Sequence, residues 1–351
     1  MIDISEDLPG YSFIASGVKD SAGNEAMDGC EDAEPLIERL SDGRIFACVA
    51  DGLGGYSHGF DGKSGGFIAC RTVSRGALEF FQRFPQKSPE IDAFSLTDYL
   101  HRKLQHLAAL KLTPTRVKGT LAHHKLASTL ACMLIQEKQD GSAAIVRLYW
   151  IGDSRIYFLT DSGLFLLTRD DTRANVDAYE GLFQDSPMSQ FLAASMEKTW
   201  RINARELVIG KPGVLVACTD GCTAYWKRPW DFELTLMAAF ETSDNWNEWV
   251  HRIKHSLDSV RADDASLIAW PLNTGDFAGF SATMLEKRHK SAGAKAARTA
   301  ALEKMPDQQI WRKIYRPSFQ KLLAENDEST SGWRSIIHRI KQIAQSLWPF
   351  T

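Results

Sequence analysis

The aspartates of this 351-residue chain follow its apolar segments with marked regularity. RIFACVA is followed by Asp51, LYWIG by Asp153 and VLVACT by Asp220, while Asp263 stands shortly before ASLIAWPL. These short segments, rich in β-branched and aromatic residues, are typical of strands. A carboxylate is unfavourable within a strand, so its repeated placement at strand ends predicts that several ends converge on one rim.

The order of the predicted elements indicates the fold class. Strands and helices do not alternate strictly, because a run of strands sits between two groups of helices. This pattern predicts an α+β fold in which helices cover antiparallel sheets. The polar stretch before residue 213 is expected to be irregular. The predicted strands are 12–18, 44–50, 128–136, 143–152, 155–160, 163–168, 213–220 and 265–272, and the predicted helices are 64–84, 97–112 and two within 230–258.

Charge and composition exclude some classes of function. The net charge of −3 divides into −10 for residues 1–276 and +7 for residues 277–351. An acidic body does not favour nucleic-acid binding. No apolar run approaches the roughly 20 residues that span a bilayer, and the first ten residues lack a signal-peptide core, so we expect a cytoplasmic protein. The six cysteines show no CxxC pair and no zinc spacing, which predicts buried, reduced thiols.

Carboxylates gathered on one rim repel one another, and this repulsion favours protonation of one or more of them. A hard divalent cation removes it. Oxygen ligands without a competing histidine or cysteine cluster suit Mg²⁺ or Mn²⁺. A single Asp-Gly pair would indicate no more than a turn. Several of them at successive strand ends predict a metal site.

Seven stretches, taken in order, resemble the motifs of the metal-dependent protein phosphatases, the PPM or type 2C serine/threonine family, in a divergent bacterial-type branch. The stretches follow the same order and spacing as the family motifs, which makes the resemblance specific. The resemblance covers about residues 10–275. It implies a four-layer αββα sandwich of two antiparallel sheets flanked by helices. The stretches are CEDA (30–33), VADGLGG (49–55), ASTLACMLI (127–135), WIGDSRIYFL (150–159), LTRDDT (167–172), VACTDG (216–221) and RADDASLIAW (261–270).

The resemblance also implies a site for two divalent ions, Mn²⁺ or Mg²⁺. Asp51 would bridge the ions, Gly52 would offer its backbone carbonyl, and Asp32 would orient bound water. Asp264, the second acid of its pair, is expected to matter less than the first. The implied reaction is hydrolysis of phosphoserine and phosphothreonine in proteins by a metal-bridging water, opposing a serine/threonine kinase. The remaining implied metal ligands are Glu31, Asp220 and Asp263.

Two departures from the family pattern concern the phosphate and a third metal. Met27 stands where the family usually has a phosphate-binding arginine, and Lys19 is a candidate replacement or a solvated surface lysine. His124 stands where some members carry a third-metal aspartate, so that site is weakened or absent unless Asp153 or another carboxylate compensates. These departures leave an alternative open: a catalytically weak or inactive phosphatase fold that serves as a regulatory or binding module.

The resemblance ends near residue 276, so we expect a phosphatase domain at 1–276 and a basic helical extension at 277–351. Its stretch 331–348 carries isoleucine and leucine on one face of a predicted helix. Three interpretations remain open. The extension packs on the body of the protein, or it docks a partner or regulates the protein itself; binding to a membrane surface ranks third.

Overall fold

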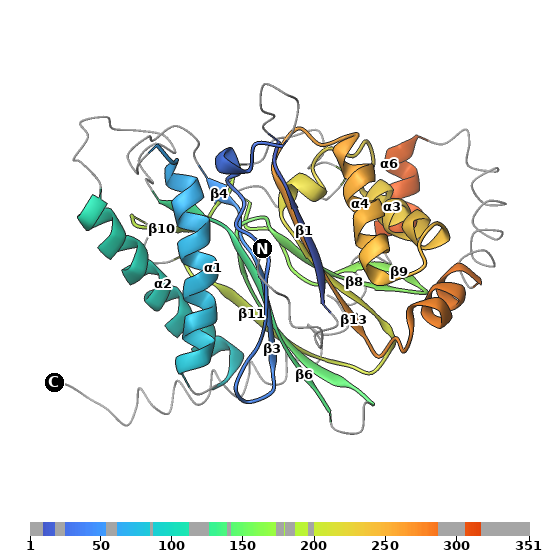
Figure 1. Ribbon diagram of the computed structural model, residues 1–351, viewed down its shortest axis with the longest axis horizontal. Helices are drawn as coiled ribbons and strands as arrows, with labels where there is room; N and C mark the ends of the chain where they lie inside the picture. Colours follow the sequence, from blue (N-terminus) through green and yellow to red (C-terminus); the bar gives the residue numbers. More distant parts are fainter. Residues whose placement is uncertain are drawn as a thin grey trace.

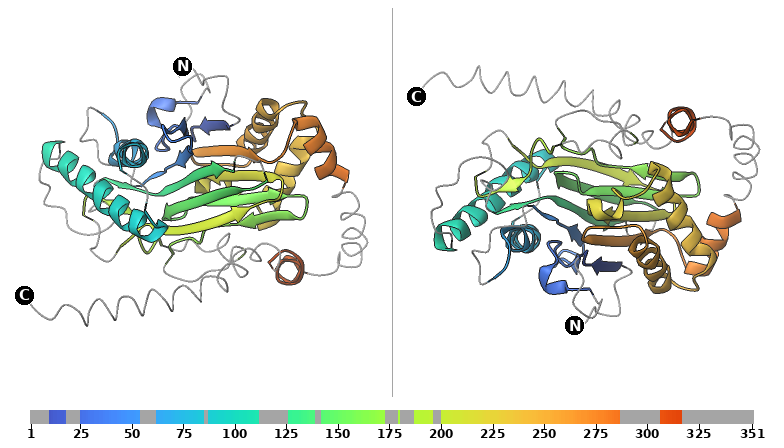
Figure 2. Two further views of the ribbon diagram at one scale, coloured as in Figure 1. Left: turned by 90° about the horizontal axis from the view of Figure 1, so that it is seen from below. Right: turned by 90° about the horizontal axis from the view of Figure 1, so that it is seen from above.

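The computed structural model describes residues 10–17, 25–53, 62–84, 87–111, 126–138, 142–172, 179, 187–195, 200–286 and 306–316. Within them, two five-stranded antiparallel sheets lie face to face, and helices cover their outer faces. Figure 1 shows α1 and α2 on one side and α3 and α4 on the other, and Figure 2 shows the stacked layers from two further directions. The predicted four-layer αββα sandwich is confirmed.

The strands fall into two large sheets and one small one. The first sheet has the order β1 (Tyr11–Ala15), β13 (Ala265–Leu272), β12 (Gly213–Cys218), β8 (Arg155–Thr160) and β9 (Gly163–Leu166). The second has the order β11 (Asn203–Ile209), β7 (Ala144–Ile151), β6 (Leu130–Glu137), β3 (Ile45–Val49) and β2 (Leu36–Arg39). The small sheet contains β10 (Leu192–Ala193), β5 (Ala127–Ser128) and β4 (Gly52–Leu53).

Helices form the two outer layers. None of the helices within the described ranges is long and apolar enough to cross a membrane. The helices are α1 (Gly65–Arg83), α2 (Pro89–Lys111), α3 (Pro229–Glu241), α4 (Trp246–Asp258), the helical residues 277–286, and α6 (Asp307–Ile310), which continues into the π-helical turn η5 (Trp311–Tyr315). Two short 3₁₀ turns, η1 (Met27–Gly29) and η4 (Asp220–Cys222), lie beside strand ends.

Alternation along each strand divides the core into layers. On β3, Phe46 and Cys48 join the apolar cluster under α1 and α2, whereas Ala47 and Val49 join the cluster between the two sheets. This is the two-residue period of a strand that is buried on both faces. All five residues of β3 are buried, which explains why RIFACVA reads as an unbroken apolar run.

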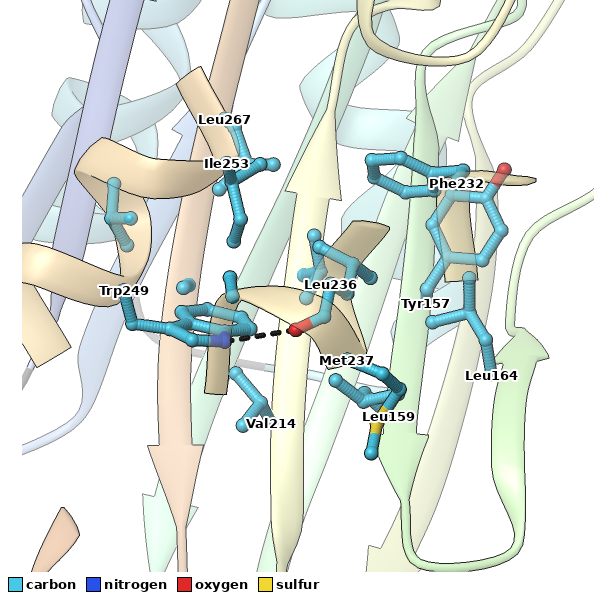
Figure 3. Close-up of a cluster of buried hydrophobic side chains, with 14 of the residues drawn as sticks. Tyr157, Leu159, Leu164, Val214, Phe232, Leu236, Met237, Trp249, Ile253 and Leu267 are labelled. Carbon is cyan, nitrogen blue, oxygen red and sulfur yellow. Dashed lines mark hydrogen bonds between the residues drawn. The ribbon is translucent and has the colours of Figure 1, made fainter. Parts of the chain in front are cut away.

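The third apolar cluster lies between the first sheet and the helices α3 and α4 (Figure 3). Trp249 of α4 is fully buried, and its indole Nε1 donates to the backbone carbonyl of Leu236 on α3 at 3.0 Å. The two helices therefore share a satisfied polar contact inside an apolar layer. Burying each large side chain of this kind contributes roughly 1.5–3 kcal/mol.

The first described part of the basic extension beyond residue 305 packs on this same cluster. Trp311 is only 1% exposed, and its ring stacks on Trp230 of α3 at 6.4 Å between centroids. Tyr315 stacks on the same indole at 4.7 Å. Residues 306–316 thus pack against the body of the protein, whereas 287–305 and 317–351 lie outside the described residues.

Several elements differ from the sequence-based expectation. The short strands β2, β4 and β10 were not predicted. Helix α2 begins at Pro89 rather than at 97, because a proline in the first turn is compatible with a helix and the Ser88 hydroxyl accepts from the Ile91 N–H at 3.4 Å. The stretch expected to be irregular contains β11, which pairs with β7 along its full length. Burial alternates at its end, as in an edge strand: Leu207 and Ile209 are buried, whereas Val208 between them is exposed.

We predict that Trp311→Ala lowers the free energy of unfolding by about 3–5 kcal/mol, because it removes a buried indole and its stacking contact. Urea denaturation of the full chain measures this change. Leu110→Ala is the control, since Leu110 is 68% exposed and surface substitutions usually stay within about 0.5 kcal/mol. Equal stabilities of the two variants would contradict the packing of the 306–316 segment.

Candidate active site

Antiparallel pairing brings the aspartates at strand ends to one rim. Cys218 on β12 pairs with Leu267 on β13, and the Thr219 N–H donates to the Ser266 carbonyl at 3.0 Å. Asp220 follows one strand and Asp263 precedes the other, so the two acids lie at the same end of neighbouring strands. The sequence predicted this convergence from the positions of the acids alone.

Asp51 lies at the centre of the rim. Its backbone forms an isolated bridge with Asp32, and its N–H donates to the Thr129 hydroxyl at 3.0 Å. The Thr129 N–H in turn donates to the Asp51 carbonyl at 2.8 Å. Burial raises the pKa of the Asp51 carboxyl well above its ordinary value, and four neighbouring carboxylates raise it further: those of Asp32, Asp220, Asp153 and Asp263.

The neighbours of Asp51 are perturbed in the same direction. Burial raises the pKa of Asp32 to about 7. Burial, with repulsion from Asp220, raises the pKa of Asp153 to about 8. Burial and the Asp263 carboxylate raise the pKa of Asp220 to about 6, against the opposing charge of Arg155. The negative charge at this rim is therefore unfavourable without a cation.

Among the residues that the structure describes, two buried carboxylate oxygens at the rim have no hydrogen-bond partner. They are Oδ1 of Asp32 and Oδ1 of Asp153. The other oxygen of Asp32 accepts from the Thr219 hydroxyl at 2.8 Å, which fixes the orientation of this carboxylate. A buried acceptor without a partner is costly, so each of these oxygens is suited to a ligand or a water molecule.

Glu31 is anchored from both its side chain and its backbone. Its carboxylate accepts from the hydroxyl of Ser64, and the same Ser64 oxygen caps α1 by accepting from the Phe67 N–H at 3.0 Å. Its carbonyl accepts from the Gly52 N–H at 3.1 Å. Burial raises the pKa of Glu31, and the charges of Asp264 and Asp263 add to this.

The glycine after Asp51 is required by close packing. A Cβ atom built on Gly52 would lie 2.3 Å from the Gly66 carbonyl oxygen and 2.8 Å from that of Glu31. No side chain fits there without movement of the backbone. Gly52 thus lets β4, the Glu31 segment and the start of α1 meet. Residues 54–61 lie outside the described part of the chain.

A second group of polar residues supports the turn that carries Asp153. Gly152 has a φ of 94°, and its N–H donates to the Asp171 carboxylate at 3.1 Å. Arg155 pairs with Asp170 at 2.7 Å and donates to the Thr223 hydroxyl at 3.1 Å. The two stretches WIGDSRIYFL and LTRDDT, both singled out in the sequence, are therefore in direct contact.

Asp264 is a rim residue whose contacts were not predicted from the sequence. Its side chain is buried, and its two oxygens accept from the Gly17 N–H at 2.7 Å and from the Glu31 N–H at 2.5 Å. Asp263, by contrast, is exposed. The one available signal was the position of Asp264 directly before a fully buried strand.

Comparison with known proteins agrees with this geometry. The family model for protein phosphatase 2C matches residues 26–270. The chain belongs to the protein phosphatase 2C family. No curated protein matches it.

Solved phosphatase structures share the fold. The Mycobacterium tuberculosis serine/threonine phosphatase PstP/Ppp aligns with a TM-score of 0.53 and 17% identity over 75% of this chain and 97% of its own. Stp1 from Staphylococcus aureus gives 0.53 and 15% over 76% and 94%. The catalytic domain of PstP in complex with two manganese ions gives 0.53 and 15% over 74% and 96%. At these identities the likeness establishes the fold alone.

The protein phosphatase 2C assignment raises the question of whether the rim fits divalent cations. The candidate ligand atoms at the rim are all oxygens. Two of them have no hydrogen-bond partner among the described residues, and the carboxylates repel one another. These features fit Mg²⁺ or Mn²⁺. As they stand, no three histidine, cysteine or acidic side chains of the described residues close around a common point.

Some residues singled out in the sequence cannot be placed. Lys19 and His124 lie outside the described residues. Met27, at the position of the family arginine, is 37% exposed. Lys63 reaches the neighbouring residue, since its Nζ lies 2.9 Å from the Asp28 carbonyl oxygen and 3.1 Å from the Asp28 carboxylate.

We predict that the metal-free protein loses stability as the pH rises from 6 to 8. The raised pKa values mean that the folded state holds protons more tightly than the unfolded chain, and this contribution is lost as the pH passes through about 6 to 8. Thermal unfolding in excess chelator measures it.

Mn²⁺ should abolish this loss of stability between pH 6 and pH 8, because bound cations favour ionised carboxylates. Asp153→Asn should flatten the pH dependence in chelator. A melting temperature in chelator that rises between pH 6 and pH 8 would contradict the predicted repulsion.

Proposed function

We propose that this chain is a cytoplasmic enzyme that hydrolyses phosphoserine and phosphothreonine in proteins, using Mn²⁺ or Mg²⁺ and opposing a serine/threonine kinase. The observation that supports this best is the gathering of carboxylates at one rim, where burial, and then repulsion from four neighbouring aspartates, raises the pKa of Asp51. Family membership supports it independently. A rim of this kind would serve no purpose in a purely structural domain, where the same positions would be less costly without charge.

Asp51 and the Gly52 carbonyl would hold the cations, together with the ligands inferred from the resemblance. Bound there, two such ions would acidify a water molecule and offset the negative charge of the phosphoryl oxygens. The manganese pair in the PstP catalytic domain supports this choice of metal. The further ligands proposed are Glu31, Asp220 and Asp263.

Asp32 would orient the attacking water. Its Oδ2 is held by the Thr219 hydroxyl, and its Oδ1 is buried and free to accept a hydrogen bond. A carboxylate fixed at one oxygen and open at the other directs a water molecule without binding the substrate itself. The Thr219 hydroxyl thus supports the proposed chemistry through Asp32.

The substrate phosphate still requires a cation. Lys19 remains the sequence-based candidate. Lys63 is a second candidate, because its only described acid partner is the fully exposed Asp28 carboxylate, and exposed ion pairs are weak enough to be exchanged for a phosphate. For a third metal ion, the proposed region remains His124 and Asp153, of which Asp153 carries the open oxygen.

We predict that Asp51→Asn reduces the turnover of a phosphothreonine peptide in Mn²⁺ by more than about 100-fold, beyond the loss typical of residues that only support a metal ligand. The fold should persist, since the substitution relieves repulsion in the metal-free protein. Asp220→Asn and Asp263→Asn should weaken Mn²⁺ binding in calorimetric titrations.

Glu38→Gln is the matched control, because Glu38 is an exposed acid on the edge strand β2. Asp51→Asn turning over at the wild-type rate would refute the assignment of Asp51. A wild-type chain that binds Mn²⁺ and phosphopeptide but does not hydrolyse it would instead establish the regulatory module as its function.

We further propose that the residues after 316 dock the phosphoprotein substrate or the cognate kinase through the apolar face predicted for 331–348. Docking there would contribute binding energy remote from the reacting phosphate. This interpretation is compatible with Trp311 packing on the body, because it concerns only the later part of the extension.

Deleting residues 317–351 should leave hydrolysis of a small chromogenic phosphate ester unchanged and reduce activity on a phosphorylated protein. Ile340→Glu should reproduce that selective loss, whereas Gln342→Glu, off the predicted apolar face, should not. Steady-state kinetics on both substrates measure the effect. Unchanged kinetics on both after deletion would rule out docking by this segment.

A further inference from the structure

We propose that Asp264 is a positioning residue that fixes Glu31 and Asp263 relative to each other, and thereby sets the affinity of the rim for divalent cations. This inference rests on the proposed function, because it takes Glu31 and Asp263 as metal ligands. Asp264 itself is not among the metal ligands that the resemblance implies.

The side chain of Asp264 joins two segments that are distant in sequence. Oδ2 accepts from the Glu31 N–H at 2.5 Å, and Oδ1 accepts from the Gly17 N–H at 2.7 Å. Both bonds go to one carboxylate that is only 7% exposed. Charge-assisted hydrogen bonds from backbone donors are short and directional, so they hold the Glu31 backbone at a defined distance from the start of β13.

The backbone of Asp264 holds the other proposed ligand. Its N–H donates to Oδ1 of Asp263 at 2.9 Å, which orients that exposed carboxylate. The Arg261 guanidinium fixes the same loop from the other side, donating to the Asp263 carbonyl at 3.0 Å. One residue therefore orients Asp263 through its main chain and Glu31 through its side chain.

Close packing leaves this junction little freedom to adjust. A Cβ on Gly17 would lie 2.7 Å from the carbonyl carbon of Asp263, and a Cβ on Gly221 would lie 1.8 Å from the carbonyl oxygen of Asp264. Gly221 directly follows Asp220. Three ligand-bearing segments thus meet at Asp264, and a shift there is passed to all of them.

A carboxylate is the side chain that this junction requires. Aspartate offers an acceptor to each of the two N–H groups, whereas asparagine offers one acceptor and turns an NH₂ group toward the other donor. Asp264→Asn therefore keeps the size of the side chain but breaks one of the two bonds, leaving one backbone donor unsatisfied.

The test compares Asp264→Asn with Asp92→Asn in the full-length chain. Asp92 is a matched control because it is 3% exposed and its two oxygens accept from the Lys87 N–H at 3.0 and 3.2 Å, at the start of α2. We expect Asp264→Asn to bind Mn²⁺ about 10- to 100-fold more weakly in calorimetry, the usual effect of removing a partner that orients a ligand.

Asp92→Asn should lower the melting temperature and leave Mn²⁺ affinity within about twofold of wild type, since loss of a buried bond alone reduces stability. Hydrogen exchange of the metal-free protein tests the Asp264–Glu31 hydrogen bond directly. The Glu31 amide should be protected in the wild type and should exchange faster in Asp264→Asn, but not in Asp92→Asn.

Unchanged Mn²⁺ affinity in soluble Asp264→Asn overturns the proposal, as does rapid exchange of the Glu31 amide in the wild type. Should the asparagine variant not fold, Asp264→Glu, which keeps both acceptors one methylene further out, should still show weakened Mn²⁺ binding. A wild-type chain that binds no Mn²⁺ refutes the proposed function itself, and this inference with it, so the two failures are distinguishable.

Discussion

Mutual repulsion among the rim carboxylates is the constraint on which the rest of this structure depends. Asp51 lies among four other aspartates, and the pairing of β12 with β13 and of β3 with β6 holds the strand ends near which three of them stand. Three apolar layers supply the rigidity that opposes this repulsion. The sandwich therefore stores an unfavourable electrostatic arrangement that a cation would relieve, which is a common relation between a stable scaffold and a functional site.

Hydrogen bonds from neutral groups complete this arrangement. The Thr219 and Ser64 hydroxyls donate to the carboxylates of Asp32 and Glu31, and the Thr129 hydroxyl accepts from the Asp51 N–H. The first two contacts orient carboxylates without cancelling their charge. Arg155 is the exception, since it opposes the raised pKa of Asp220 while it is paired with Asp170.

Much of the fold could be predicted from the sequence, because strand ends carry local signals. The predicted strands 155–160 and 265–272 match β8 and β13 at both ends, since turn residues or acids flank each of them. The edge strand β11 was missed because Arg205 and Glu206 interrupt its apolar pattern. In the site, the acids at strand ends could be predicted from the sequence. The contacts of Asp264 could not, because its partners Gly17 and Glu31 lie 247 and 233 positions earlier in the chain, and no local pattern encodes such distant contacts.

The stacking of Trp311 and Tyr315 on Trp230 has a geometric consequence for the chain that follows. The 35 residues after Arg316 begin from a fixed point on α3. Fully extended, a chain of this length reaches at most about 120 Å. Any molecule captured by that segment is therefore confined to a bounded volume around the domain, where its local concentration depends on chain length and not on its abundance in solution.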